Sequence, residues 1–282
     1  MPPTCTVEHN AAFGHTGPNG TGRPLHCDIY QPTGPRLGVL LVHGGGWREG
    51  NREMVVGQAE ALAAQGFTCV ACEYRLTPEA PWPAQLQDVK CAVRYMRASA
   101  STLGIDRERI CALGNSAGAH LVLMLGGTPG NADYEGEGGH AGESSAVAAI
   151  IAVYAPTVFR SSDARVSGSV PARALLGDAL GDALGGNDAV AAAISPITYV
   201  RADFPPTILL HGTGDKVVPV TASIRFFEAL SAAGGKVDMH IYAEMPHGWA
   251  RRPEWTGPTM AEAGVFLKRY VVAPAEWPAA SA

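Results

Sequence analysis

The sequence predicts an α/β fold in which a mostly parallel sheet is covered by helices on both faces. Short continuous apolar runs alternate along the chain with stretches of helical periodicity, and this alternation is typical of parallel sheets with crossover helices. Hydrophobic residues make up 46% of the 282 residues and charged residues only 17%, so the chain can form one large core. Because α/β folds of this length often form one unit, we expect residues 1–282 to be a single domain.

The expected strands are short apolar runs bounded by turn residues, as in strands that are buried on both faces of a sheet. Residues 25–30 come first, and we expect them to form an antiparallel strand at the edge of the sheet. The later strands are expected at residues 38–42, 67–73, 109–113, 147–154, 207–210 and 237–242.

The expected helices lie between or after these strands. Residues 83–100 show the pattern, because the apolar residues Leu86, Val89, Val93 and Met96 recur near helical spacing. The other helices are expected at residues 58–65, 116–125, 221–233 and 258–270. A glycine directly follows two of them, which is a common way for a helix to end.

Two regions interrupt the alternation of strands and helices. Residues 126–145 are rich in glycine and acidic residues, so we expect an exposed, flexible loop. Residues 155–201 form a long connection with weak helical patterning, and they contain a tandem Gly-Asp-Ala-Leu repeat at residues 177–184. We expect a small cap or lid, where one is present, to come from residues 155–201.

The charge and hydropathy of the chain argue against several classes of partner. Lys and Arg number 21 and Asp and Glu number 26, which gives a net charge of −5 and no basic surface for nucleic acid or an anionic membrane. No apolar run approaches the roughly 20 residues that a membrane span needs. The first residues lack the basic and apolar segments of a signal peptide, so we expect a cytoplasmic location. The composition leaves the oligomeric state open.

The six cysteines are interpreted as reduced residues, most of them in the core. Cys69, Cys72 and Cys111 lie inside apolar strand-like runs, where a free cysteine behaves as a small hydrophobic residue. Cys69 and Cys72 have the spacing of a redox or zinc half-site, but in a strand their side chains point to opposite faces. No second pair of ligands follows them, so we expect no metal site and no cofactor.

The most informative motif is Gly114-Asn115-Ser116-Ala117-Gly118, a G-x-S-x-G pentapeptide between an expected strand and an expected helix. A serine in this position lies on a sharp turn that exposes its hydroxyl as a nucleophile. The glycines are needed because a Cβ would clash where the turn crowds the backbone. A tight turn without a catalytic role would give the same pattern, so the neighbouring motifs decide the interpretation.

Three further groups come shortly after expected strands. His43-Gly44-Gly45-Gly46-Trp47 follows the strand at 38–42, Asp215 follows the strand at 207–210, and His247 follows the strand at 237–242. Ligands bind at the carboxyl ends of the strands in an open parallel sheet, so these groups are expected to meet near Ser116. A serine needs a base, the base needs an orienting carboxylate, and the oxyanion needs backbone N–H donors.

These motifs resemble those of the hormone-sensitive-lipase-like esterases of the α/β-hydrolase fold. Two further segments carry the same resemblance: Tyr74-Arg75-Leu76-Thr77-Pro78-Glu79 and Ser195-Pro196-Ile197-Thr198-Tyr199. The resemblance is closest to the bacterial acetyl xylan, feruloyl and lipase-like esterases with a short cap, and it covers about residues 36–270. It implies an α/β-hydrolase fold with a mostly parallel eight-stranded sheet, helices on both faces and a small cap.

The same resemblance assigns roles to individual residues. It implies Ser116 as the nucleophile, with Asp215 and His247 as its triad partners. It implies an oxyanion hole formed by the N–H groups of Gly45, Gly46 and Ala117. The sequence departs from the family pattern at three positions: Asn115 replaces the commoner His or Asp, Ala119 replaces a common glycine, and Glu73 replaces a common aspartate.

Several other polar residues are interpreted as structural. We expect His120 and His211 to be packed histidines and His43 to brace the glycine loop through hydrogen bonds. Arg75, Glu79 and Asp88 are expected to form a buried ion network. Asp182 and Asp203 are weaker candidates than Asp215 for the triad, because neither follows a convincing strand. Trp47 and Trp249 flank the expected site and either wall the substrate pocket or cap the sheet.

The sequence therefore predicts a serine carboxylesterase that hydrolyses short- to medium-chain esters through an acyl-enzyme. Its expected partner is a small-molecule ester, with no cofactor or metal. An arylformamidase or other amidase on the same scaffold stays open, although such relatives usually carry Tyr where Gly46 stands. A catalytically inactive ligand-binding homologue also stays open, although such proteins often lose the histidine that His247 supplies here.

Overall fold

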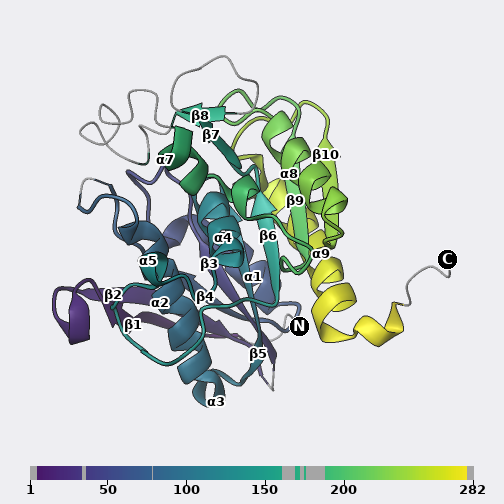
Figure 1. The fold of residues 1–282 in the computed structure, drawn as a ribbon. Coiled ribbons are helices and arrows are strands. Elements are labelled where there is room, and N and C mark those ends of the chain that lie inside the picture. The colour runs from purple at the N-terminus through teal and green to yellow at the C-terminus, as the bar shows by residue number, and fades with distance from the viewer. Residues whose placement is uncertain are drawn as a thin grey trace.

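The computed structural model describes residues 5–33, 36–77, 79–160, 169–171, 175 and 188–277. Its centre is an eight-stranded sheet with the strand order β1-β2-β4-β3-β5-β6-β9-β10 (Figure 1). The strands are β1 (Thr6–His15), β2 (Pro24–Gln31), β3 (Arg36–Val42), β4 (Thr68–Cys72), β5 (Ile105–Asn115), β6 (Ala149–Val153), β9 (Thr207–Gly212) and β10 (Val237–Tyr242). Strands β1, β2 and β4 pair antiparallel, and the other pairs are parallel. The expected mostly parallel eight-stranded sheet is confirmed.

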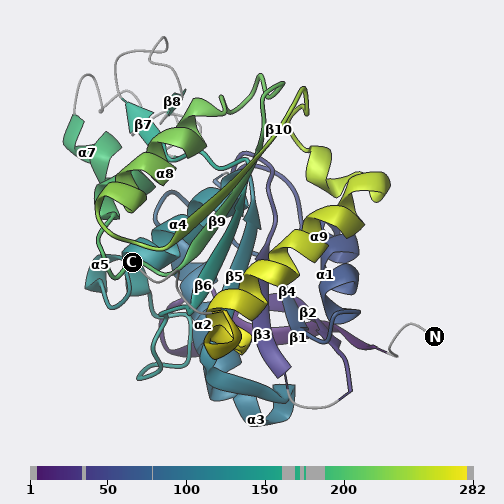
Figure 2. The ribbon, with the colours of Figure 1, turned by 90° about the vertical axis from the view of Figure 1, so that its right-hand side faces the viewer.

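Helices cover both faces of this sheet (Figure 2). One face packs against α1 (Val56–Ala63) and α9 (Pro253–Leu267), and the other packs against α2 (Ala84–Ala98), α4 (Ala117–Gly127) and α8 (Thr221–Ala232). The side chains of β4 alternate between the two apolar layers, as the pleat of a strand requires. Cys69 accordingly lies in one layer and Cys72 in the other, and all six cysteines are free thiols, as the sequence predicted.

The remaining short elements lie at the ends of the sheet or between helices. They are α3 (Ala100–Leu103), α5 (Ala132–Glu135), α7 (Asp188–Ala193), the strands β7 (Val158–Arg160) and β8 (Ser169–Pro171), and the short helical turns at Pro18–Gly20, Arg52–Val55, Pro196–Tyr199, Trp249–Arg251, Lys268–Val272 and Pro274–Glu276. Strands β7 and β8 form a separate two-stranded parallel sheet. With α7, they lie together at one end of the main sheet, beyond the carboxyl end of β6 (Figure 1). The tandem repeat at 177–184 lies outside the described residues.

The expectation that residues 25–30 form an edge strand was wrong in one respect. These residues form β2, which is antiparallel, but β2 lies between β1 and β4, and β1 is the edge strand. Most side chains of β1 are exposed, so this strand has no apolar run that a sequence pattern would detect. The sequence analysis also placed the start of the last helix too late, at Pro258. The helix α9 begins at Pro253, and Pro258 lies inside it.

The expectation of an exposed loop at residues 126–145 was also wrong in part. This segment contains α5 and is bound to α2 by an ion cluster, in which the fully buried Lys90 lies 2.7 Å from Glu135 and Arg94 lies 2.9 Å from it. Burial raises the pKa of Glu135, but hydrogen bonds from Lys90 and Ser145 outweigh it and hold that pKa below its usual value. The acidic composition of the segment therefore supplies the counter-charge for buried cations of α2.

This ion cluster generates a prediction about stability. Glu135→Gln leaves the Lys90 ammonium buried without a carboxylate, which should lower the free energy of unfolding by about 2 kcal/mol, less than for a fully buried pair because Glu135 is 25% exposed. Urea unfolding measures this change, with the exposed Glu137→Gln as the matched control. Equal losses in the two variants would show that the cluster does not anchor the segment.

Candidate active site

Ser116 lies on the turn between β5 and α4, in a backbone conformation that side chains rarely adopt. Its φ is 54° and its ψ is −116°. The turn is possible because its two flanking glycines have no side chain: a Cβ on Gly114 would lie 2.2 Å from the Gly118 carbonyl oxygen, and a Cβ on Gly118 would lie 2.2 Å from the Val42 carbonyl oxygen. The Ser116 N–H donates to the Val153 carbonyl at 2.9 Å and fixes the turn to β6.

The side chains of Ser116, His247 and Asp215 form a continuous hydrogen-bonded chain. The Oγ of Ser116 lies 2.9 Å from Nε2 of His247, and Nδ1 of His247 lies 2.6 Å from Oδ2 of Asp215. Asp215 is an acceptor when ionised, so the arrangement requires Nδ1–H on His247 and leaves the Nε2 lone pair facing the serine. The structure thus brings together the three residues that the sequence selected from the ends of three strands.

Asp215 is held as a carboxylate by its surroundings. Its side chain is fully buried, and its Oδ1 accepts hydrogen bonds from the backbone N–H groups of Val217 and Val218 at 2.8 and 2.9 Å. Burial raises its pKa, but the hydrogen bonds from His211, His247 and Val218 outweigh that effect and hold the pKa below its usual value. The weaker candidate Asp203 is 82% exposed and pairs with Arg201, and Asp182 lies outside the described residues.

His211 is structural, as predicted. Its Nδ1 lies 2.7 Å from the Ser223 hydroxyl, and its Nε2 lies 2.9 Å from the Val218 carbonyl and 3.4 Å from Asp215. The ring therefore fixes the loop that carries Asp215.

The glycine loop after β3 lies directly against the serine turn. A Cβ on Gly44 would lie 2.9 Å from the Asn115 carbonyl oxygen and 3.3 Å from the Cβ of Ser116. Gly45 and Gly46 have positive φ angles of 115° and 59°, and within the described residues their N–H groups donate no hydrogen bond to the protein. The N–H of Ala117 belongs to the first turn of α4, where a helix has no internal acceptor for it. Gly45 and Gly46 line the same cavity as Ser116.

His43 and Tyr74 brace this loop, as the sequence predicted for His43. Nδ1 of His43 lies 2.6 Å from the Gly44 carbonyl, and its ring stacks on Tyr74 with the centroids 4.3 Å apart. The Tyr74 hydroxyl donates to the His43 carbonyl at 3.2 Å. Burial lowers the pKa of His43 to about 4, so the ring is neutral and suited to a fixed hydrogen bond.

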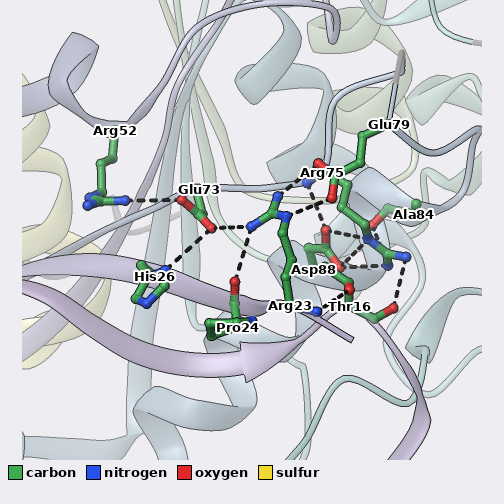
Figure 3. Close-up of polar contacts among 10 residues, drawn as sticks. All are labelled: Thr16, Arg23, Pro24, His26, Arg52, Glu73, Arg75, Glu79, Ala84 and Asp88. Atoms are coloured by element: carbon green, nitrogen blue, oxygen red, sulfur yellow. Dashed lines mark hydrogen bonds and ion pairs between the residues drawn. The ribbon is translucent and has the colours of Figure 1, made fainter. Parts of the chain in front are cut away.

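An ion network fixes the segment that follows Tyr74 (Figure 3). Arg75 lies 2.7 Å from Asp88 on α2, and its backbone N–H also donates to that carboxylate at 2.8 Å. The expectation that Glu79 belongs to this pair was wrong: Glu79 binds Arg23 at 2.7 Å, and Arg23 also binds Glu73. Arg23 comes from the residues just before β2, so this contact depends on a partner far away in the sequence.

Asn115, which departs from the family pattern, is among the residues that line the cavity beside Ser116, and its side-chain amide is hydrogen-bonded within the protein. Its side chain is buried, with its Nδ2 donating to Gln58 at 2.6 Å and its Oδ1 accepting from the Tyr154 hydroxyl at 3.2 Å. The amide of Asn115 therefore ties the serine turn to α1 and to the end of β6.

The structure places Trp47 and Trp249 in the core, and neither lines the cavity beside Ser116. Trp47 is 2% exposed because its indole N–H turns inward to donate to Nδ1 of His120 at 3.2 Å. Trp249 is fully buried between Tyr242 and Trp255, in the apolar layer under α9. The sequence left two hypotheses open, that these tryptophans wall the substrate pocket or that they cap the sheet. Their buried positions agree with the second hypothesis.

His120 is the packed histidine that the sequence predicted, and it joins two parts of the fold. Its Nε2 lies 2.8 Å from the Ile194 carbonyl at the end of α7. Because Trp47 donates to Nδ1, the proton is on Nε2 and the ring is a neutral bridge between the glycine loop and α7. Burial lowers the pKa of His120 to about 4, which agrees with this neutral form.

A cavity of about 570 Å³ opens beside Ser116. Its wall includes the glycine loop and His247, and it also includes Tyr154, Val217 and Arg251, which the sequence did not single out. Tyr154 follows β6 at the same edge of the sheet, which was a usable signal. Arg251 lies four residues after His247, and nothing in the pattern marks it.

A larger cavity of about 800 Å³ lies at the opposite end of the sheet, lined by residues such as Leu37, Phe67 and Ile105 at the amino ends of strands. None of Ser116, His247, Asp215 or the glycine loop lines this second cavity. In the described part of the chain, no cluster of three His, Cys, Asp or Glu side chains is arranged to hold a metal ion. None of the described helices has the length and apolar character needed to cross a membrane.

Comparisons with known proteins give a consistent result. Residues 27–230 match the BD-FAE family. Esterase LipC of Mycobacterium tuberculosis is 33% identical over 253 residues, which are 84% of this chain and 59% of the relative. Esterase LipQ of the same organism is 32% identical over 232 residues, or 80% of this chain and 54% of the relative. The chain thus spans a little over half the length of these curated relatives.

Solved structures with the same fold cover nearly the whole chain. Native esterase 2 of Thermogutta terrifontis superposes with a TM-score of 0.77 at 26% identity, covering 96% of this chain and 94% of that one. A truncated carbohydrate esterase from gut microbiota superposes with a TM-score of 0.76 at 26% identity, covering 94% and 98%. The α/β-hydrolase fold expected from the sequence is confirmed.

The two buried neutral histidines beside the glycine loop generate a prediction about pH. In the unfolded chain a histidine takes up a proton below about pH 6.5, whereas His43 and His120 do so only near pH 4 in the folded protein. The unfolded state therefore binds more protons in this window, and the free energy of unfolding should fall as the pH falls from 6.5 to 4, by up to about 1.4 kcal/mol per pH unit for each residue.

His120→Phe should remove the part of this pH dependence of the free energy of unfolding that His120 contributes. This expectation holds even if the substitution changes the stability at pH 7. Urea unfolding at pH 5 and pH 7 measures the slope, and His9→Gln is the control because His9 is 64% exposed. The same slope in His120→Phe as in the unaltered protein would contradict a neutral, buried His120.

Proposed function

The chain belongs to the BD-FAE family of the α/β-hydrolases, and from this premise we propose that it is a serine carboxylesterase acting through an acyl-enzyme. The observation that carries the proposal is the hydrogen-bonded chain from Ser116 through His247 to Asp215. The esterase relatives support the same activity.

Acylation begins when Nε2 of His247 takes the proton of Ser116 and Oγ attacks the ester carbonyl carbon. The carbonyl oxygen becomes an oxyanion, which the N–H groups of Gly45, Gly46 and Ala117 stabilise by hydrogen bonds. The tetrahedral intermediate collapses, the bond to the alcohol oxygen breaks, and His247 returns its proton to that oxygen. Asp215 stabilises the imidazolium while it exists and keeps the ring in the tautomer that the reaction needs.

Deacylation repeats these steps with water. His247 removes a proton from a water molecule, the hydroxide attacks the acyl carbon, and the oxyanion forms again at the same donors. Collapse releases the carboxylic acid and returns the proton to Ser116. His247 is suited to both half-reactions, because its side chain is 21% exposed while that of Asp215 is fully buried.

We propose short- to medium-chain acyl groups as the preferred substrates. The cavity beside Ser116 has about 570 Å³ and is lined by glycine backbone and polar groups with few apolar side chains. Structures of Thermogutta terrifontis esterase 2, similar at 26% identity, are described as bound to propionate and to butyrate, and this supports small acyl groups here.

We also propose that the connection at 155–201 forms the small cap. The described parts of this connection include α7, which is joined to the glycine loop through His120. Phe159 of β7 packs against the rings of Trp47 and His120. These contacts support a cap that rests on the glycine loop.

The nucleophile is tested with an alkyl fluorophosphonate probe. Labelling should be lost in Ser116→Ala and strongly reduced in His247→Ala, because the probe reports an activated serine. Asp215→Asn should lower kcat by about 10⁴-fold, as loss of the tautomer control does in such triads. The exposed Ser101→Ala and His240→Ala are matched controls and should label normally, and strong labelling of Ser116→Ala would refute the assignment.

The acyl preference is tested with p-nitrophenyl esters from C2 to C12. We expect the highest kcat/KM between C2 and C6, because few apolar side chains line the cavity to hold a longer chain. Ser116→Ala supplies the background rate. A maximum at C10 or longer would contradict the proposed substrate size while leaving the triad unaffected.

A further inference from the structure

The cavity beside Ser116 carries an excess of positive charge. Arg48, Glu49 and Arg251 all contribute to its wall, which gives two guanidinium groups and one carboxylate. Across the residues that the structure describes, neither guanidinium lies within the 4.0 Å ion-pair distance of a carboxylate. This local charge is opposite in sign to the net charge of −5 of the whole chain. A guanidinium in a substrate cavity that has no carboxylate of the protein beside it points to an anionic group on the substrate.

Arg251 is the better placed of the two arginines, because the fold fixes its backbone. It ends the short turn Trp249–Arg251, whose first two residues are fully buried. Its N–H donates to the Gly248 carbonyl at 3.3 Å. The guanidinium folds back over the residue that follows His247: its Nη2 lies 3.6 Å from the point that a Cβ on Gly248 would occupy.

Tyr154 lines the same cavity and lies near the guanidinium. Burial raises the pKa of the Tyr154 hydroxyl, and Arg251 opposes that rise through its charge and a side-chain hydrogen bond. The Tyr154 ring in turn contacts the His247 ring, with the centroids 4.7 Å apart. The exposed side chain of Arg251 therefore lies close to the proposed base, with Tyr154 and His247 in the same cavity wall. A guanidinium has five N–H donors, more than one hydroxyl accepts, so donors remain for a ligand in the cavity.

We propose that Arg251 binds an anionic group of the substrate, so that the preferred substrates are esters that carry a carboxylate near the scissile bond. The proposal rests on the esterase function proposed above and narrows its substrate class. A guanidinium matches a carboxylate through two parallel hydrogen bonds, which an ammonium group does not. The carboxylate of Glu49 repels an anionic substrate. In the sum of charges on the cavity wall, the positive charge of Arg48 cancels that of Glu49, so the positive charge of Arg251 is left over.

The test compares charged and neutral esters of nearly equal shape. For a carboxylate on the acyl side, the pair is monoethyl succinate and ethyl levulinate. For a carboxylate on the alcohol side, the pair is acetoxyacetate and acetoxyacetone. We expect the charged member of at least one pair to have the higher kcat/KM, by about tenfold or more, as for a charge-assisted hydrogen bond. The preference should shrink with added salt, because the site is exposed.

The variants assign the preference to one residue. In Arg251→Gln the charged ester should lose at least about tenfold more kcat/KM than its neutral counterpart, and Arg251→Lys should restore the preference only in part. Arg252→Gln is the matched control: it removes the neighbouring exposed arginine, which does not line the cavity, and should leave the ratio unchanged.

Three outcomes would overturn the inference: no preference for the charged member in either pair, an equal loss for both members in Arg251→Gln, or an equal effect of Arg252→Gln. The second would mean that Arg251 acts by positioning Tyr154 and His247. Failure of the proposed function is distinct, because it would appear as no hydrolysis of any of the four esters and no labelling of Ser116.

Discussion

The close approach of two backbone segments, the end of β3 and the turn that carries Ser116, is the constraint on which the rest of the site depends. The missing side chains of Gly44 and Gly118 allow this approach, since a Cβ at either position would overlap a carbonyl oxygen of the other segment. Backbone contact fixes distance more tightly than side-chain packing, because it has no rotamers. The relative position of the serine and the loop donors is therefore set by the fold itself.

The strained conformation of Ser116 persists because its neighbours determine it. A non-glycine residue at φ 54° and ψ −116° costs about 1–3 kcal/mol, and it persists only where the surroundings offset that cost. Here the Ser116 N–H is bound to β6, and the Asn115 side chain is bound to Gln58 and Tyr154. The buried amides of Asn115 and Gln58 satisfy each other, so they hold the turn without leaving a polar group unpaired.

Sequence patterns predicted the parts of the site that depend on local order along the chain. Ser116, Asp215 and His247 each follow a strand, and parallel strands bring their carboxyl ends to one edge, so their meeting follows from topology. The partner of Glu79 was not predictable in this way, because Arg23 reaches it from a distant part of the chain. Strand β1 escaped detection for another reason: an edge strand with exposed side chains has no apolar run.

The two tryptophans show the same limit for aromatic residues. Both lie next to predicted site residues in sequence, yet Trp47 turns its indole toward His120 and Trp249 fills the layer under α9. Adjacency along the chain does not determine side-chain direction at a turn, because one residue of a turn faces the cavity while the next faces the core. The direction depends on which apolar layer has space, and only the assembled tertiary structure supplies that information.

Burial decreases along the proposed triad, and this gradient suits the chemistry. The Asp215 side chain is fully buried, where a carboxylate is stable only because hydrogen bonds from His211, His247 and two backbone N–H groups balance its desolvation. The His247 side chain is 21% exposed, and Ser116 lies on the cavity wall. The negative charge of Asp215 stabilises a protonated His247 next to it, because the electrostatic interaction is strong where the local dielectric is low. In the proposed mechanism this open end admits the water that hydrolyses the acyl-enzyme, so the arrangement suits both half-reactions.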